Sequence, residues 1–199
     1  MVKTESVELF TSLLAVLALG GSLLYAITAR LIPATPGSSI AALGRAVSVE
    51  VRRLGLWLAW SIAAVATAGS LYFSEVADYV PCRLCWFQRI CMYPLAGILL
   101  VAAIRKESSV RWYALPLLLA GVAVSGYHYL IEWRPSLGEN ACGVGPSCTD
   151  IWFRSLGFMT LAGMALFGFL AIALLLFVQP KSSVEHVAVE SESLHSAER

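Results

Sequence analysis

Charged side chains are scarce in this sequence: Lys and Arg number 14 and Asp and Glu number 13, together 14% of the 199 residues. Soluble domains usually carry charge on about a quarter of their residues. The two signs nearly cancel, to a formal net charge of +1, so the basic surface expected of a nucleic-acid-binding protein is lacking. With 58% hydrophobic residues, the composition indicates a membrane protein.

The N-terminus also lacks the features of a cleavable signal peptide. Its first apolar run is flanked by Glu5 and Glu8 as well as Lys3, and it is longer than the roughly 7–15 apolar residues of a signal sequence. We therefore expect a retained helix. Several runs approach or exceed the length of about 18 residues that marks a transmembrane candidate. They cover residues 9–29, 54–73, 86–104, 112–131 and 156–178.

These runs predict an all-α membrane protein. The short connections between the last four favour an antiparallel four-helix transmembrane bundle over residues 54–178, with one extra N-terminal transmembrane helix in 1–31. Residues 32–53 are expected to be a cytoplasmic linker, and the polar residues 179–199 a disordered cytoplasmic tail. The first span carries no cysteine or histidine, so it is expected to be an accessory to the bundle.

The loops differ in their content of Lys and Arg, which sets orientation because positively charged loops stay in the cytoplasm. Nine such residues fall on one side of the expected membrane and four on the other, with Arg89 just inside a helix. The richer side, which includes Arg45 and Arg105, is expected to be cytoplasmic. The N-terminus, the turn at Cys82 and the loop 132–155 are then expected to face outward.

Four of the five cysteines fall on that outer side, where disulfides form and persist. Cys82 and Cys85 form a Cys-x-x-Cys pair at the mouth of the third span, where a helix N-terminus and nearby cations stabilise a thiolate. Cys142 and Cys148 lie in a glycine-containing loop, where a disulfide could exchange with another protein or act as a structural staple. Cys91, inside the span, is expected to be a small buried apolar residue.

Arg89 lies four residues after Cys85, about one turn deeper on the same helix face. A charge at that depth costs a few kcal/mol. It could snorkel to the headgroups, but the spacing to Cys85 favours a role in stabilising a thiolate or an anionic cofactor. His128 could be hydrogen-bonded within the bundle or contact the same ligand. The two cysteine pairs could instead form a four-cysteine zinc site, which an oxidising exterior disfavours.

The string PCRLCWFQRICMYPL at residues 81–95, followed by an outer-loop cysteine pair and one more span, resembles the DsbB/BdbC family of membrane disulfide-bond formation proteins. The resemblance covers about residues 54–178, and the short second pair is more similar to the BdbC branch. The extra N-terminal span is not part of the family's four-helix pattern. The second pair is also too close in sequence to leave room for the long loop of the enterobacterial DsbB type.

The resemblance implies a protein-disulfide:quinone oxidoreductase in the bacterial plasma membrane. Its partner would be an extracytoplasmic thioredoxin-like (DsbA-like) thiol oxidase, and its electron acceptor a membrane quinone, ubiquinone or menaquinone. By this likeness Cys142 accepts the partner's thiolate and Cys148 then attacks Cys82. Cys85 is the thiolate that meets the quinone, and both pairs are expected to be disulfides in the isolated protein. The residues implied to hold the quinone head group are Gln88, Arg89 and His128.

Three alternatives remain. A vitamin K epoxide reductase-type protein also has four helices and two cysteine pairs, but there the loop pair precedes the helix-mouth pair, and here the order is reversed. A membrane thiol reductant would bury single cysteines deep in two spans, and only Cys91 is even partly so placed. A non-enzymatic metal-binding or scaffold protein would carry stoichiometric zinc.

Overall fold

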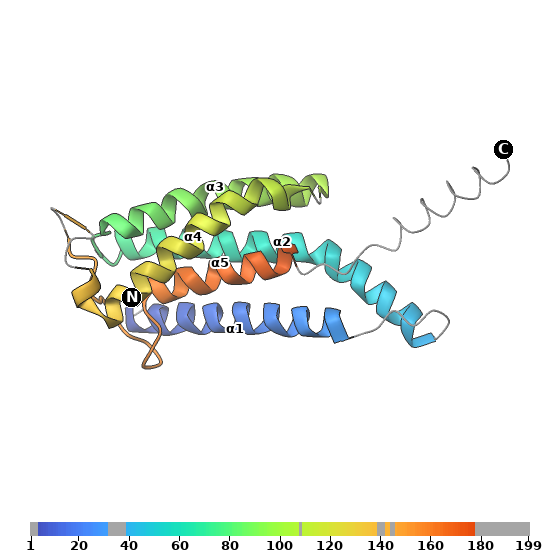
Figure 1. Cartoon of the computed structure of the whole chain (residues 1–199), viewed down its shortest axis with the longest axis horizontal. Coiled ribbons are helices and arrows are strands. Elements are labelled where there is room, and N and C mark those ends of the chain that lie inside the picture. Colours follow the sequence, from blue (N-terminus) through green and yellow to red (C-terminus); the bar gives the residue numbers. More distant parts are fainter. Residues whose placement is uncertain (1–3, 32–38, 108, 139–141, 144–145, 178–199) are drawn as a thin grey trace.

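The structure, a computed structural model, describes residues 4–31, 39–107, 109–138, 142–143 and 146–177. It is all-α, as predicted, and its described residues form no strand beyond an isolated bridge between Ser155 and Met159. Figure 1 shows the long helices running side by side along one axis. In chain order the helices are α1 (Thr4–Leu31), α2 (Ser39–Glu75), α3 (Arg83–Arg105), α4 (Val110–Trp133), the short 3₁₀ helix η1 (Pro135–Leu137) and α5 (Leu161–Phe177).

Four of these helices contain segments long and apolar enough to cross a membrane, which makes this a multi-pass membrane protein. The segments are Thr4–Ile27, Leu54–Glu75, Arg83–Arg105 and Val110–Trp133. The fifth helix, α5, is apolar but shorter, with 17 residues.

The last span begins later than expected, at Leu161 rather than at residue 156. Backbone hydrogen bonds between Ser155 and Met159 close a tight turn just before it. Within that turn Leu156 and Gly157 have positive φ angles of 56° and 78°, which an α-helix does not allow. Because this turn contains apolar residues, hydropathy alone predicted a span that includes the turn and begins too early.

Helix α2 differs from expectation in the other direction, because it begins at Ser39, well before the apolar segment that starts at Leu54. Residues 39–53 of the expected linker are thus helical. Residues 32–38 and the expected tail 179–199 lie outside the described residues.

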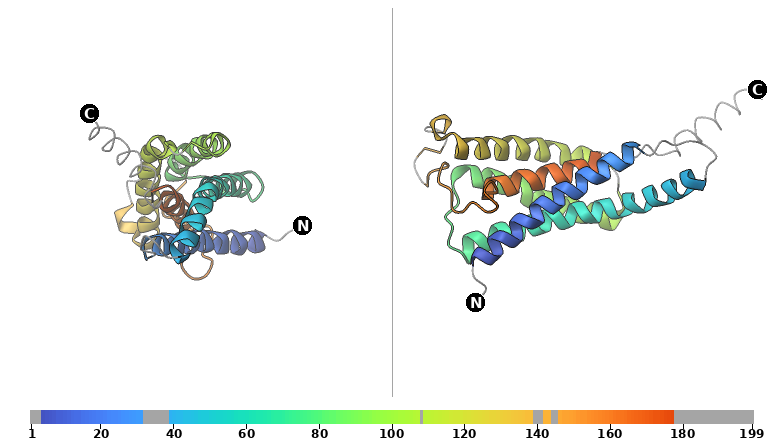
Figure 2. Two further views of the ribbon diagram at one scale, coloured as in Figure 1. Left: turned by 90° about the vertical axis from the view of Figure 1, so that its right-hand side faces the viewer. Right: turned by 90° about the horizontal axis from the view of Figure 1, so that it is seen from below.

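The bundle core is formed by α2, α3, α4 and α5, and α1 is added on one side. Helix α1 packs mainly along α5 and only at its margin against α2, and Figure 2 shows it lying beside these two helices. Leu95, Leu99, Leu118 and Phe169 are fully buried between the helices. Many other large apolar side chains are exposed on the outer faces, as expected for helices that face lipid.

The start of α1, the end of α2, the start of α3, the end of α4 and the start of α5 lie at one end of the bundle (Figure 1). We call this the cysteine end, formed by residues 76–82 and the described part of 134–160. Four of the five cysteines lie here or at the adjoining first turn of α3.

Candidate active site

The first element of the site is the start of α3, where Cys82 is the N-cap residue. Its backbone is extended, and its sulfur accepts a hydrogen bond from the Cys85 backbone N–H at 3.4 Å. The two sulfur atoms lie 3.0 Å apart and are not bonded, since a disulfide requires about 2.05 Å. Both cysteines are therefore free thiols in this structure, and the disulfide expected for this pair in the isolated protein stays a prediction.

Cys82 is buried, with 5% of its surface exposed, yet its pKa is lowered well below the ordinary thiol range. The largest cause is the hydrogen bond from the Cys85 thiol, and the interaction with His128 and the Cys85 backbone N–H act in the same direction. Burial opposes these effects without overcoming them. Cys82 therefore favours the thiolate, the nucleophilic form of cysteine.

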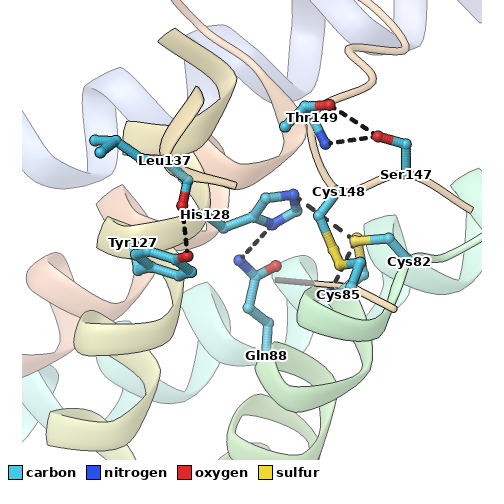
Figure 3. The surroundings of a disulfide bond; sticks show 10 residues. Cys82, Cys85, Gln88, Tyr127, His128, Leu137, Ser147, Cys148 and Thr149 are labelled. Carbon is cyan, nitrogen blue, oxygen red and sulfur yellow. Dashed lines mark hydrogen bonds between the residues drawn. A yellow bond between two sulfur atoms is a disulfide. The ribbon is translucent and has the colours of Figure 1, made fainter. Parts of the chain in front are cut away.

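His128, buried on α4, links Cys82 to a third residue. Its Nε2 lies 3.7 Å from the Cys82 sulfur, and its Nδ1 lies 3.2 Å from Nε2 of Gln88 (Figure 3). Because the Gln88 amide nitrogen is a donor, it favours the tautomer in which Nδ1 accepts and Nε2 donates toward sulfur. The structure thus places His128 against the cysteine pair, and His128 is not among the residues that line the cavity described below.

The loop pair, Cys142 and Cys148, forms a disulfide that lies against the first pair. The sulfur atoms of Cys82, Cys142 and Cys148 all lie within 4.8 Å of one another. Cys148 is buried at 2% exposure, next to Leu84, and Cys142 is half-buried. The sequence predicted an exposed loop disulfide, whereas here only its Cys142 side is accessible.

The opposite side of the dithiol faces a cavity of about 840 Å³ that is lined by α1 together with α2, α3 and α5. Cys85, Gln88 and Arg89 line its end nearest the cysteines, so the predicted neighbourhood of Cys85 and Arg89 is present. The volume falls within the roughly 300–1,000 Å³ of small-molecule sites. Cys82 is not a lining residue, so the two sulfurs of the pair face different surroundings.

Arg89 is held at the cavity by α2. Its Nε donates to the Ser70 hydroxyl and its Nη2 to the Ser70 carbonyl oxygen, both at 3.0 Å, and its guanidinium lies 5.2 Å from the Trp86 ring centroid. Ser70 uses two of the five N–H donors of the guanidinium. No described carboxylate forms an ion pair with it, so this positive charge lacks a counter-ion in the described part of the protein.

Stacked aromatic rings surround the cysteine end of the cavity. Tyr79 stacks on Phe73 with ring centroids 5.7 Å apart and on Trp152 at 4.7 Å, and all three residues line the cavity. The Tyr79 hydroxyl donates to Glu8 at the start of α1. Burial and this contact with Glu8 raise the pKa of Tyr79 to about 12, so the hydroxyl stays protonated at physiological pH.

Sequence reasoning missed three parts of this arrangement. It found neither the contact of Ser70 with Arg89 nor the contact of Tyr79 with α1. It also placed Glu132 in a loop, whereas Glu132 is buried at the end of α4 and accepts a hydrogen bond from Thr160. An ionisable residue at the end of an apolar run was the available signal for Glu132.

Three residues of the site are close enough together to bind a metal ion. The donor atoms of Cys82, Cys85 and His128 lie within 4.8 Å of one another and could supply three ligands. The four-thiolate zinc alternative needs all four cysteines free, and Cys142 and Cys148 are joined in a disulfide.

Comparison with known proteins agrees with this chemistry. The family profile described as "Disulfide bond formation protein DsbB" matches residues 52–179. The "Probable disulfide formation protein C 2" of Bacillus anthracis is 40% identical over 128 residues, which cover 64% of this chain and 91% of the relative. The "Disulfide bond formation protein C" of Bacillus subtilis is 40% identical over 118 residues, 59% of this chain and 86% of the relative. A "Probable disulfide formation protein" of Coxiella burnetii is 39% identical over 134 residues, 66% of this chain and 91% of the relative.

No solved structure gave a significant match. The family match begins at residue 52, so it leaves out α1. It covers well over half of the chain and includes all the cysteines, which confirms the resemblance predicted from the sequence. The chain therefore belongs to the DsbB family of membrane proteins that support disulfide bond formation.

Proposed function

We propose that the protein reoxidises an extracytoplasmic thioredoxin-like dithiol protein and passes the electrons to a membrane quinone. One observation carries the proposal: the Cys82–Cys85 dithiol touches the loop disulfide through Cys82 and the cavity through Cys85. A protein thiol reaches the site from water, whereas a quinone reaches it from the lipid. A dithiol between the two can exchange with both.

The thiol steps are a chain of exchanges in which one sulfur–sulfur bond forms as another breaks. A partner thiolate attacks Cys142, and Cys148 leaves as a thiolate. Cys148 then attacks Cys82, which breaks the Cys82–Cys85 bond and releases the Cys85 thiolate. The partner's second thiolate closes the partner's disulfide and frees Cys142. Attack of Cys142 on Cys148 restores the loop disulfide and leaves Cys82 and Cys85 reduced.

That last state has the same bonding as the structure, with the loop disulfide closed and the helix-mouth pair open. From it, the dithiol gives two electrons and two protons to the quinone and closes its own disulfide. The balance is one partner dithiol and one quinone consumed, and one partner disulfide and one quinol produced.

The described residues suit a quinone head group. A quinone carbonyl gains negative charge on reduction, and the Arg89 guanidinium, without a counter-ion among described residues, can donate to it. Gln88 also lines the cavity, although its amide contacts His128. We propose that His128 interacts with the Cys82 thiol rather than with the quinone ring, because its Nε2 lies 3.7 Å from the Cys82 sulfur.

The test is a purified system with a reduced thioredoxin-like protein and an isoprenoid quinone. We expect one quinol formed per partner disulfide, followed by ultraviolet absorbance and thiol titration. A partner that keeps only its attacking cysteine should remain attached at Cys142, as read by peptide mass spectrometry. Attachment at Cys82, or partner oxidation without quinol formation, would contradict the proposal.

A further inference from the structure

The cavity has a wall that the family match does not include. Helix α1 lies before residue 52, where the match begins, yet many of its residues line the cavity. Resting on the proposed function, we infer that α1 completes a groove that binds the isoprenoid tail of the quinone. The helix would thereby make the protein selective for long-tailed quinones.

The lining residues of α1 recur at helical spacing. They include Thr11, Ala15, Ala18, Ser22 and Tyr25, which are three or four residues apart and so share one face of the helix. The spacing shows that α1 presents a continuous stripe to the cavity along much of its length.

The cavity is longer than a quinone ring requires. Phe73 and Leu58 both line it and are 15 residues apart on α2, which corresponds to about 22 Å along the helix axis. The hydrocarbon core of a bilayer is about 30 Å thick, so the cavity extends through much of that depth. Cys85 and Arg89 are at one end only, and the remainder suits a long apolar chain.

Small residues on both walls leave room for such a chain. Ala18 and Gly21 line the groove from α1, and Ala66 and Gly69 line it from α2. A Cβ atom added at Gly21 or at Gly69 would meet nothing within 4 Å. The space between the two helices is therefore open at these positions.

The groove is also open toward the lipid. Leu17 and Leu24 line it while 68% and 63% of their surface is exposed. Helix α1 touches α2 only at its margin, whereas it packs along α5. A tail can therefore enter sideways between α1 and α2.

Two contacts fix α1 at the cysteine end of this groove. The Tyr79 hydroxyl donates to Glu8, and the Ser12 hydroxyl lies 3.7 Å from the Met164 sulfur on α5. Because Tyr79 also lines the cavity, this first contact joins the start of α1 to the proposed head-group end.

Two adjacent glycines of α1 provide a matched test. Gly21 lines the groove and Gly20 does not, and a Cβ atom at either position would meet nothing within 4 Å. Gly21→Leu would place a side chain in the groove, and Gly20→Leu would place one outside it. The change in helix propensity is the same in both variants.

The experiment measures quinone binding to the full-length protein by quenching of tryptophan fluorescence, together with the KM for each quinone. Ubiquinone and menaquinone are each compared with the same ring lacking its tail. Gly21→Leu should weaken binding of the tailed quinones by about tenfold, as expected for overpacking of a filled site. Gly21→Leu should not change the affinity for the tail-less quinone rings. Gly20→Leu should bind tailed and tail-less quinones as the unmodified protein does.

Equal affinities of the two variants for tailed quinones would overturn the inference, while quinol formation by the unmodified protein would leave the proposed function standing. If the unmodified protein binds and reduces no quinone, the proposed function fails and the tail groove fails with it. Thiol exchange at Cys142 in both variants shows that the bundle is folded.

Discussion

Cys82 and Cys85 are three residues apart but have different neighbours. Cys82 is buried beside His128 and the loop disulfide, whereas Cys85 lines the cavity with Arg89. One helix turn therefore separates a sulfur suited to exchange with Cys148 from a sulfur suited to a lipid-soluble acceptor. The role of each sulfur can be tested by changing its neighbour, which is His128 for Cys82 and Arg89 for Cys85.

The first prediction concerns the ionisation of Cys82. Because its pKa is lowered, the reduced protein should keep a Cys82 thiolate at pH values well below the ordinary thiol pKa of about 8.5. His128→Ala removes one cause of that shift, so the midpoint of the alkylation rate against pH should rise and the rate at low pH should fall. Mass spectrometry of the Cys82 peptide after timed alkylation measures both.

Ser125→Ala is the control, because Ser125 is also buried on α4 but donates to the backbone of its own helix. It should leave the profile unchanged. An unchanged midpoint in His128→Ala would show that His128 does not stabilise the thiolate.

The second prediction concerns Arg89, which should act on the quinone step and not on thiol exchange. Arg89→Lys keeps the charge but loses the planar fork, so the apparent KM for quinone should rise, and Arg89→Ala should raise it further. Loss of one charged hydrogen bond corresponds to about tenfold or more. Steady-state kinetics with varied quinone give the KM, and trapping at Cys142 gives the exchange step.

Arg83→Ala is the matched control, since Arg83 is exposed at the start of α3 and does not line the cavity. If Arg89→Ala leaves quinone kinetics unchanged, or mainly disturbs insertion, then Arg89 is only a headgroup anchor.

For individual residues, the sequence predicted contacts along one helix better than contacts between helices. The four-residue spacing correctly placed Arg89 beside Cys85, because that relation depends only on helical geometry. The sequence left the role of His128 open, since its contact with Cys82 depends on how α4 is rotated against α3. The partner of Arg89, Ser70, depends in the same way on the packing of α2.

The third prediction concerns the contact between α4 and α5, which requires a glycine. A Cβ atom at Gly121 would lie 2.3 Å from the ring of Phe169, which is fully buried and has little room to move. Gly121→Ala should lower the free energy of unfolding by about 1–3 kcal/mol. Thermal unfolding in detergent, followed by circular dichroism, measures the loss.

Gly97→Ala is the control, because a Cβ atom at Gly97 in α3 meets nothing within 4 Å. It should be neutral or should stabilise the protein by up to about 1 kcal/mol. A stable Gly121→Ala variant would mean that the Phe169 ring can turn aside.

Helix number was predictable from hydropathy, but helix ends were not. Apolar runs located the four long spans because lipid requires length and apolarity. Hydropathy could not separate the turn at Leu156 and Gly157 from α5, because the turn residues include apolar ones. It also could not show that residues 39–53 are helical, because a helix outside the bilayer need not be apolar.

For the whole molecule, the distribution of charge and of cysteine distinguishes the two ends of the bundle. At the end opposite the cysteines, the last residue of α3 is Arg105, Lys106 follows it in the link, and Arg111 lies in the first turn of α4. The cysteine end carries the loop disulfide and the dithiol. Since Lys- and Arg-rich short loops stay cytoplasmic, the cysteine end should be extracytoplasmic, where disulfides persist.

The last prediction tests this orientation with single introduced cysteines and a membrane-impermeant thiol reagent. Ser136→Cys, at an exposed position in η1, should be labelled in intact cells. Arg105→Cys, exposed at the end of α3, should be labelled only after permeabilisation. The unmodified protein, in which Cys82 and Cys91 are buried and Cys85 is half-buried, sets the background. Labelling of Arg105→Cys but not Ser136→Cys in intact cells would put the dithiol in the reducing cytoplasm, where it could not serve exported proteins, and would overturn the proposed direction of electron flow.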